Sequence, residues 1–199
     1  MLSRVRSRLC GSAGDEGLTL VELLVTMLIL SLVTAAAYSV LITVSKQSQD
    51  ISGRQETVGQ ARLALEQLDR QIRSGNVLYD PQYEALPMSM RVYTQANGQE
   101  RCVQWQVTGG VLRSRSWSTT WQTDGLVTSW GIVARGIQNT TSPFTLDNAS
   151  AYGARLINIS LLVKDPAAGG NTQNVQDSLS GRNTEYGYDT GVCTPLPAP

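Results

Sequence analysis

The chain has few side chains that could carry out chemistry. It contains no histidine, and its three cysteines, Cys10, Cys102 and Cys193, form no C-x-x-C pair. The lack of histidine removes Ser-His-Asp and Cys-His nucleophiles and most zinc sites. No glycine-rich phosphate loop follows a predicted strand. We therefore expect no enzymatic activity, no bound metal and no cofactor.

Glu22 is the ionisable residue in the most unusual setting. It lies near the start of the apolar segment "GLTLVELLVTMLILSLVTAAAYSVLITVS" at residues 17–45, of which 23–45 carry no charge and no proline. An ionised acid costs about 2.5–3.5 kcal/mol at the middle of a bilayer and less near its edge, so such groups usually have a partner. The "TLVE" of Thr19 to Glu22 also matches a capping box, with Thr19 as the helix cap. The cap explains the local position but not the charge in an apolar segment.

The apolar segment is long enough to cross a membrane. At about 1.5 Å per residue, residues 23–45 span roughly 34 Å as a helix, against a bilayer core of about 30 Å. Three arginines precede it, at positions 4, 6 and 8, and no Lys or Arg follows before Lys46. The positive-inside rule then predicts a single pass with a cytoplasmic N-terminus and an exported chain from about residue 46. A signal peptide has a shorter apolar core and a small-residue cleavage site, so we expect the span to remain in the mature protein.

The residues around Glu22 resemble the processing signature of type IV prepilins and type II secretion pseudopilins. In "G-LTLVELLV" a glycine is followed by a large apolar residue and by a glutamate at the fifth position after it. The resemblance implies that a prepilin peptidase removes residues 1–17 by cutting between Gly17 and Leu18, and then methylates the Leu18 amine. It also implies that Glu22 pairs with the N-terminus of a neighbouring subunit and sets the register of packed helices. Leu18 replaces the commoner phenylalanine, and acidic residues precede Gly17 where Lys or Arg is usual.

The helical pattern continues beyond the apolar segment. Apolar residues at a spacing of three or four mark one face, namely Ile51, Val58, Ala61, Leu65, Leu68 and Ile72. The "SGN" at 74–76 indicates the end of the helix, near residue 75. The exported part is predicted to bury this face beneath a sheet.

The remaining chain is predicted to be β-rich. "RCVQWQV", "TGG" and "VLRSRSW" predict a hairpin over 101–117, and further strands are expected at 129–137, 154–165 and near "VQDSLSGRNT" at 175–184. The fold class is therefore α+β, a pilin-like fold in which a long N-terminal helix, half transmembrane and half amphipathic, packs on an antiparallel sheet. The predicted regions are the leader 1–17, the transmembrane or filament-core helix 18–45 and the exported domain 46–199.

The exported cysteines could form one bridge. Cys102 and Cys193 lie in an oxidising compartment if the orientation is as predicted, whereas Cys10 lies in the leader. Two unpaired, buried thiols are the alternative.

Charge and aromatic content give a second, weaker hypothesis. Removing residues 1–17 leaves 13 basic and 14 acidic side chains, which gives no electrostatic attraction to nucleic acid. Arginines at 101, 113 and 115 and tryptophans at 105, 117, 121 and 130 could nevertheless contact DNA, because aromatic rings stack on bases. Tryptophans in a small sheet are more often core or cover, and we favour that interpretation.

The sequence thus predicts a minor pilin or pseudopilin, a structural subunit of a type IV pilus or type II secretion-like filament. Its partners would be the prepilin peptidase, other pilins and the membrane. Its location would be the bacterial inner or cytoplasmic membrane as a precursor, then an extracytoplasmic or cell-surface filament. Residues 59–76, "GQARLALEQLDRQIRSGN", and 179–184, "LSGRNT", resemble PilW-type and J-type minor pilins. Two alternatives remain, a DNA-uptake pilus subunit and a binding or adhesion domain on an uncleaved single-pass anchor.

Overall fold

A computed structural model describes residues 19–96, 98–147, 155–165, 171–182, 189 and 191–198. The predicted leader, together with Gly17 and Leu18, lies outside the described residues. The chain divides into two compact units, Met1–Gln47 and Ser48–Pro199, which are described separately below.

The main helix, α1, comprises Leu20–Arg73 and belongs to both units. It begins after Thr19, whose Oγ1 accepts a hydrogen bond from the Glu22 N–H at 3.3 Å. The helix ends at Arg73, close to the predicted end, and strand β1 starts at Gly75. A side chain at Gly75 would lie within 2.9 Å of the Ile72 carbonyl oxygen, so the close approach at this turn favours glycine.

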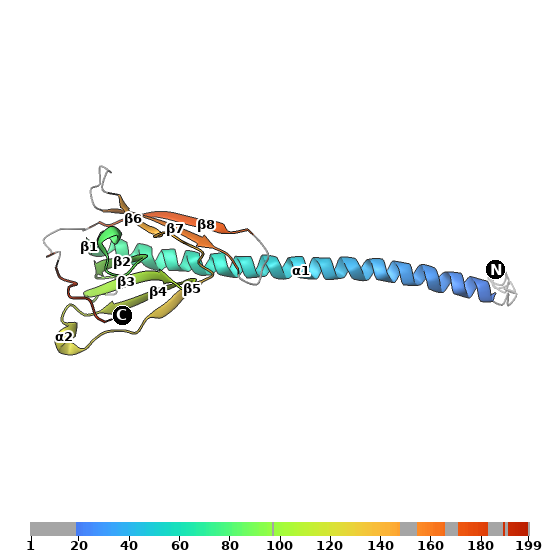
Figure 1. The fold of residues 1–199 in the computed structure, drawn as a ribbon, viewed down its shortest axis with the longest axis horizontal. Helices are drawn as coiled ribbons and strands as arrows, with labels where there is room; N and C mark the ends of the chain where they lie inside the picture. The colour runs from blue at the N-terminus through green and yellow to red at the C-terminus, as the bar shows by residue number, and fades with distance from the viewer. Residues whose placement is uncertain are drawn as a thin grey trace, which may run out of the picture. The chain divides into compact units, whose positions relative to one another are not determined.

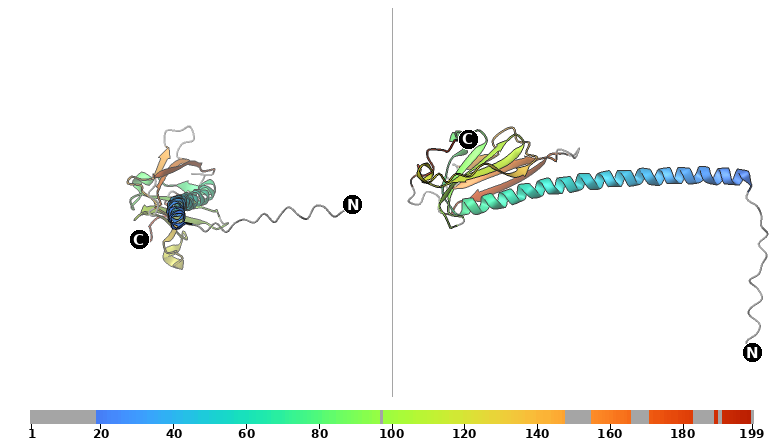
Figure 2. Two further views of the ribbon diagram at one scale, coloured as in Figure 1. Left: turned by 90° about the vertical axis from the view of Figure 1, so that its right-hand side faces the viewer. Right: turned by 90° about the horizontal axis from the view of Figure 1, so that it is seen from below.

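The second unit contains two antiparallel sheets, where the sequence predicted one. The first has the order β1-β2-β3-β4-β5, and the second has the order β6-β7-β8. The strands are β1 Gly75–Leu78, β2 Ser89–Thr94, β3 Arg101–Thr108, β4 Val111–Trp117, β5 Gly131–Arg135, β6 Phe144–Asp147, β7 Leu156–Val163 and β8 Gln173–Ser180, with short helices η1 Pro81–Tyr83 and α2 Trp121–Asp124. Figures 1 and 2 show the two sheets against the C-terminal part of α1. The predicted α+β class, a long helix packed on antiparallel sheets, is confirmed.

The β3–β4 hairpin forms as predicted. Gly109 and Gly110 connect the strands with φ angles of +56° and +75°, a left-handed conformation that matches the twist of a two-residue turn. The pairing runs from Thr108 with Val111 to Cys102 with Trp117.

One face of α1 in the second unit is buried in a core shared by both sheets. The fully buried helix residues are Ala61, Ala64, Leu65, Leu68 and Ile72. Val58 is only half-buried, and Ile51, which continues the predicted stripe, is 51% exposed. The core residues of the sheets contact α1 only from Val58 onward, so the apolar pattern extends further than its burial.

The opposite face of the five-stranded sheet has its own smaller core. The buried residues there are Val77, Tyr93, Cys102, Trp117 and Cys193, and half-buried Val192 and Leu196 pack against them. The C-terminal segment 191–198 therefore covers the sheet face that α1 does not. Both faces are buried, which explains why all six residues of β2 are buried.

Candidate functional site

The candidate functional site is the N-terminal part of α1, in the first unit. Every residue from 19 to 47 is exposed, including Leu20 at 78% and Leu30 at 67%. The most apolar window has a mean hydropathy of 2.3 and contains no buried residue. By length and composition this part of the helix could cross a membrane. An apolar surface on all sides needs a surrounding that the described chain does not supply.

Five hydroxyl groups of this part are satisfied within the helix. They donate to backbone carbonyl oxygens three or four residues earlier, namely Thr26 to Leu23, Ser31 to Leu28, Thr34 to Leu30, Ser39 to Ala36 and Thr43 to Ser39, at 2.7–2.9 Å. Such bonds allow polar residues in lipid because no donor is left without an acceptor. These side chains therefore need no partner outside the helix.

The Glu22 carboxylate differs from the hydroxyls. Its backbone N–H binds the Thr19 hydroxyl, but its side chain returns no hydrogen bond to the Thr19 backbone, so only half of the predicted capping box forms. Among the described residues the carboxylate has no ion pair either. The side chain is exposed at the first turn of the helix. It is thus the acid of this part that remains available for a cation from elsewhere.

A shallow apolar groove runs along the same part of the helix. Its lining is Val33, Ala36, Ala37, Val40, Leu41, Val44 and Ser45. Small side chains such as Ala36 and Ala37 allow two helix backbones to approach closely when no water is present. This surface has the shape and composition to receive another helix.

The tryptophans named as nucleic-acid candidates are either buried in the core or half-buried at its surface. Trp105 and Trp117 are fully buried, and Trp121 and Trp130 are half-buried. Trp105 also donates to the Gln71 Oε1 at 2.8 Å, which ties β3 to α1. These rings are therefore parts of the packing rather than a free stacking surface.

The arginines of the same group are also engaged within the protein. Arg115 is buried, donates to the Gln104 Oε1 at 2.9 and 3.1 Å, and donates to the carbonyl oxygens of Pro197 and Ala198 at 3.1 and 2.6 Å. Burial, followed by nearby Arg113, lowers the pKa of Arg115. The centre of the Trp130 ring lies 4.4 Å from the Arg113 Cζ and 4.6 Å from the Arg115 Cζ. The Arg113 guanidinium also donates to Gln106.

A buried ion pair is the feature that the sequence did not indicate. Arg91 donates to Glu84 at 3.2 Å, and their side chains are 10% and 1% exposed. Burial raises the pKa of Glu84, although Arg91 and Gln104 oppose the rise. Glu84 Oε2 and Gln104 Nε2 are both buried and have no hydrogen-bond partner among the described residues. Glu84 and Arg91 are seven positions apart in the sequence with a turn between them, and no motif marks the pair.

Arg91 also holds the C-terminal segment. Its guanidinium donates to the Cys193 carbonyl oxygen at 3.1 Å and lies 3.9 Å from the centre of the Tyr79 ring. The Tyr79 hydroxyl accepts from the Cys193 N–H at 3.2 Å, and burial raises the pKa of Tyr79. Cys193 forms a disulfide with Cys102, with 5.7 Å between their Cα atoms. The predicted cysteine pair is therefore bonded, at the centre of this attachment.

Comparison with known proteins gives one match. Residues 13–38 match the family model described as the prokaryotic N-terminal methylation motif. This range contains Gly17, Leu18 and Glu22 and the exposed start of α1, and it supports a type IV pilin-like chain with a membrane-anchored precursor. Neither the curated proteins nor the solved structures give a match.

Proposed function

We propose that this protein is a minor pilin or pseudopilin, a non-enzymatic subunit of a type IV pilus or type II secretion-like filament. The observation that carries the proposal is the match of residues 13–38 to the methylation motif around a Glu22 carboxylate that has no partner in its own described chain. A prepilin peptidase would cut between Gly17 and Leu18 and methylate the new amine.

In this proposal Glu22 pairs with the Leu18 amine of a neighbouring subunit. Among the described residues Glu22 has no ion pair within its own chain, so the proposal assigns its partner to another subunit. In a medium of low dielectric constant, an opposite charge within about 4 Å strongly stabilises a carboxylate. A subunit shifted along the filament would leave both charges without a partner, so the pair sets the axial register.

The rest of the first unit would form the filament interior. Its internally satisfied hydroxyls and the Ala36–Ala37 groove suit contact with other helices in the absence of water. The second unit would be exported and would present a surface or help to initiate the filament. The late-helix and C-terminal segments favour a PilW-type or J-type subunit.

The decisive variant is Glu22→Ala, expressed in the native cells. We expect normal cleavage, because the peptidase acts at Gly17, but loss of the subunit from the sheared filament fraction on immunoblots. Thr19→Ala is the matched control, since it removes the observed cap and keeps the charge. It should enter filaments at close to the wild-type level.

The other hypotheses predict different results. An uncleaved single-pass anchor would retain residues 1–17 and tolerate Glu22→Ala. A DNA-uptake subunit would bind DNA in a salt-sensitive way and lose that binding when Arg113 and Arg115 are changed.

A further inference from the structure

The outer edge of β8 is an open sheet edge. β8 pairs with β7 along its whole length, from Gln173 with Val163 to Ser180 with Leu156. In the sheet order β6-β7-β8 it is the last strand, and among the described residues no strand pairs with its other edge. Open edges can accept an additional strand.

The register shows which backbone groups are free. On β7, Ser160 donates to the Pro143 carbonyl oxygen and Leu162 donates to the Asn139 side chain, so these residues direct their backbone groups toward β6. Because hydrogen bonding alternates in antiparallel pairs, their partners on β8 direct theirs outward. The outward residues of β8 are therefore Asn174, Gln176, Ser178 and Ser180.

One of these outward groups is already covered. The Ser178 N–H binds the neighbouring Asp177 Oδ1 at 2.8 Å. The N–H and carbonyl groups of Asn174 and Gln176 and the Ser178 carbonyl have no described protein partner. They form a ladder that an extended peptide could complete.

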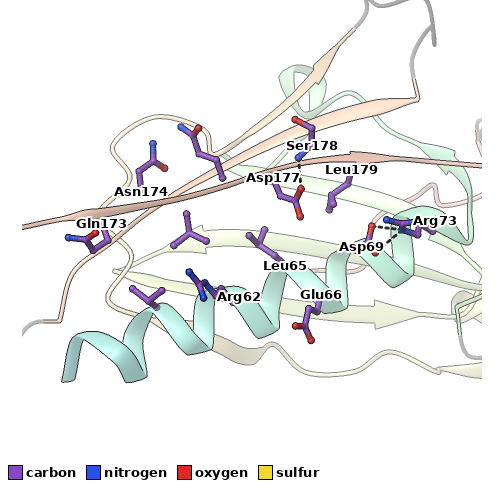
Figure 3. A pocket seen from close by; sticks show the side chains of 13 residues that line it. Arg62, Leu65, Glu66, Asp69, Arg73, Gln173, Asn174, Asp177, Ser178 and Leu179 are labelled. Carbon is purple, nitrogen blue, oxygen red and sulfur yellow. Dashed lines mark hydrogen bonds and ion pairs between the residues drawn. The ribbon is translucent and has the colours of Figure 1, made fainter. Parts of the chain in front are cut away.

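A groove of about 560 Å³ lies beside this edge, between β8 and α1 (Figure 3). Val58, Leu65, Val175 and Leu179 supply its apolar lining. A strand added to β8 would point alternate side chains into this groove, toward α1.

Five charged residues line the groove, namely Arg62, Glu66, Asp69, Arg73 and Asp177. At the Gln173 end, Arg54 lines an adjoining pocket together with Arg62. Neither arginine has an ion pair among the described residues, and the buried Arg54 Nε has no hydrogen-bond partner. At the other end Arg73 is bonded to Asp69 at 2.6 Å. The Asp69 hydrogen bond raises the pKa of Arg73, with smaller contributions that include Asp177.

We propose that this groove binds an extended segment of a partner protein, which adds antiparallel to β8 and places an acidic side chain beside Arg54 and Arg62. The open ladder fixes the backbone, the apolar floor receives the middle side chains, and the two arginines select the charge. The proposal concerns the second unit only and is independent of processing at Gly17.

The test uses the full chain in detergent micelles and the labelled peptide KTVTVTET. On one face this peptide carries lysine, two valines and glutamate, so antiparallel addition brings the glutamate to the Arg62 end. Fluorescence anisotropy should show saturable binding with a Kd below about 100 μM. The peptide KTVTVTKT, which lacks the acid, should bind at least about tenfold more weakly.

Two variants separate the ladder from the charge. Gln176→Pro removes an outward N–H and leaves the β7 pairing intact, and it should weaken KTVTVTET binding about tenfold or more. Arg62→Glu should reverse the preference between the two peptides. Thermal melting of each variant verifies its fold.

Absence of saturable binding up to about 1 mM would overturn the proposal. Equal binding by folded Gln176→Pro would also overturn it, as would a peptide-free dimer that Gln176→Pro dissociates, because the edge would then bind a second copy.

Discussion

The two parts of α1 differ in whether their apolar side chains are buried. Residues 23–45 carry no charge and are exposed on every side, whereas residues 48–73 bury one stripe against two sheets and turn polar faces to solvent. The second part has an interior made by its own chain. The first part requires an interior made of lipid or of other helices, and its sequence shows this because no polar face interrupts it.

Two carboxylates, one in each unit, show the same difference. Glu84 is buried and has Arg91 at 3.2 Å in the same chain, whereas Glu22 is exposed and has no ion pair among the described residues. The folded domain provides its own counterion. For Glu22 our proposal assigns the counterion to a neighbouring subunit.

The largest effect on stability is expected from Leu68→Asp. Leu68 is fully buried, so an acid there should cost about 4 kcal/mol or more, enough to unfold much of the domain. Thermal and urea unfolding of a fragment that begins near residue 46 would measure the loss.

Leu63→Asp is the matched control for this variant, because Leu63 is on the same helix and 64% exposed. We expect a change within about 0.5 kcal/mol. Equal stability of the two variants would refute burial of the stripe, and neither substitution should alter the proposed cleavage after Gly17.

The disulfide should have the next largest effect. It closes a loop with a sequence separation of 91, so Cys193→Ser should lower the free energy of unfolding by about 2–5 kcal/mol. Wild type in reductant should melt like the variant, and Cys10→Ser should melt like wild type. A melt of Cys193→Ser that coincides with oxidised wild type would show that hydrogen bonds alone hold the C-terminal segment.

A pH-dependent effect should come from Glu84. Its pKa in the folded state is raised by burial, so the folded state binds more protons than the unfolded state between the two pKa values. The contribution of Glu84 to stability should therefore be greatest below the unfolded value of about 4.3 and should fall as pH rises through the folded value.

Glu84→Gln should remove this fall, whereas Glu66→Gln, on the exposed face of α1, should retain it. Unfolding curves of both variants across this pH range would show the difference. An unchanged pH profile in Glu84→Gln would assign the fall to other groups.

The smallest effect distinguishes two glycines of α1. A side chain at Gly59 would meet nothing within 4 Å, so Gly59→Ala should raise stability by about 0.5–1 kcal/mol. At Gly53 the new Cβ would collide with the Asp165 Oδ2, so Gly53→Ala should gain less because Asp165 must move. A larger gain at Gly53 in thermal melts would contradict this contact.

Local signals predicted much of the fold. The end of α1 followed from "SGN", the β3–β4 turn from "TGG" and the helix stripe from apolar spacing. Strands β1, β2 and β6 were not predicted, because β1 and β6 are short and β2 is buried on both faces and shows no alternation.

The functional residues likewise divide into those that the sequence predicted and those that it did not. A local motif identified Glu22 and Thr19, and the count of exported cysteines identified the Cys102–Cys193 pair. The Glu84–Arg91 pair and the bonds from Arg115 to the C-terminal segment depend on contacts between distant residues, which no spacing rule reveals.

The most direct test is the intact mass and N-terminal peptide of the protein extracted from the membranes of its own cells. The proposal predicts a chain that begins at N-methylated Leu18, with residues 1–17 removed. A mature chain that retains residues 1–17 would contradict it and would leave Thr19 and Glu22 as the first turn of an ordinary membrane anchor.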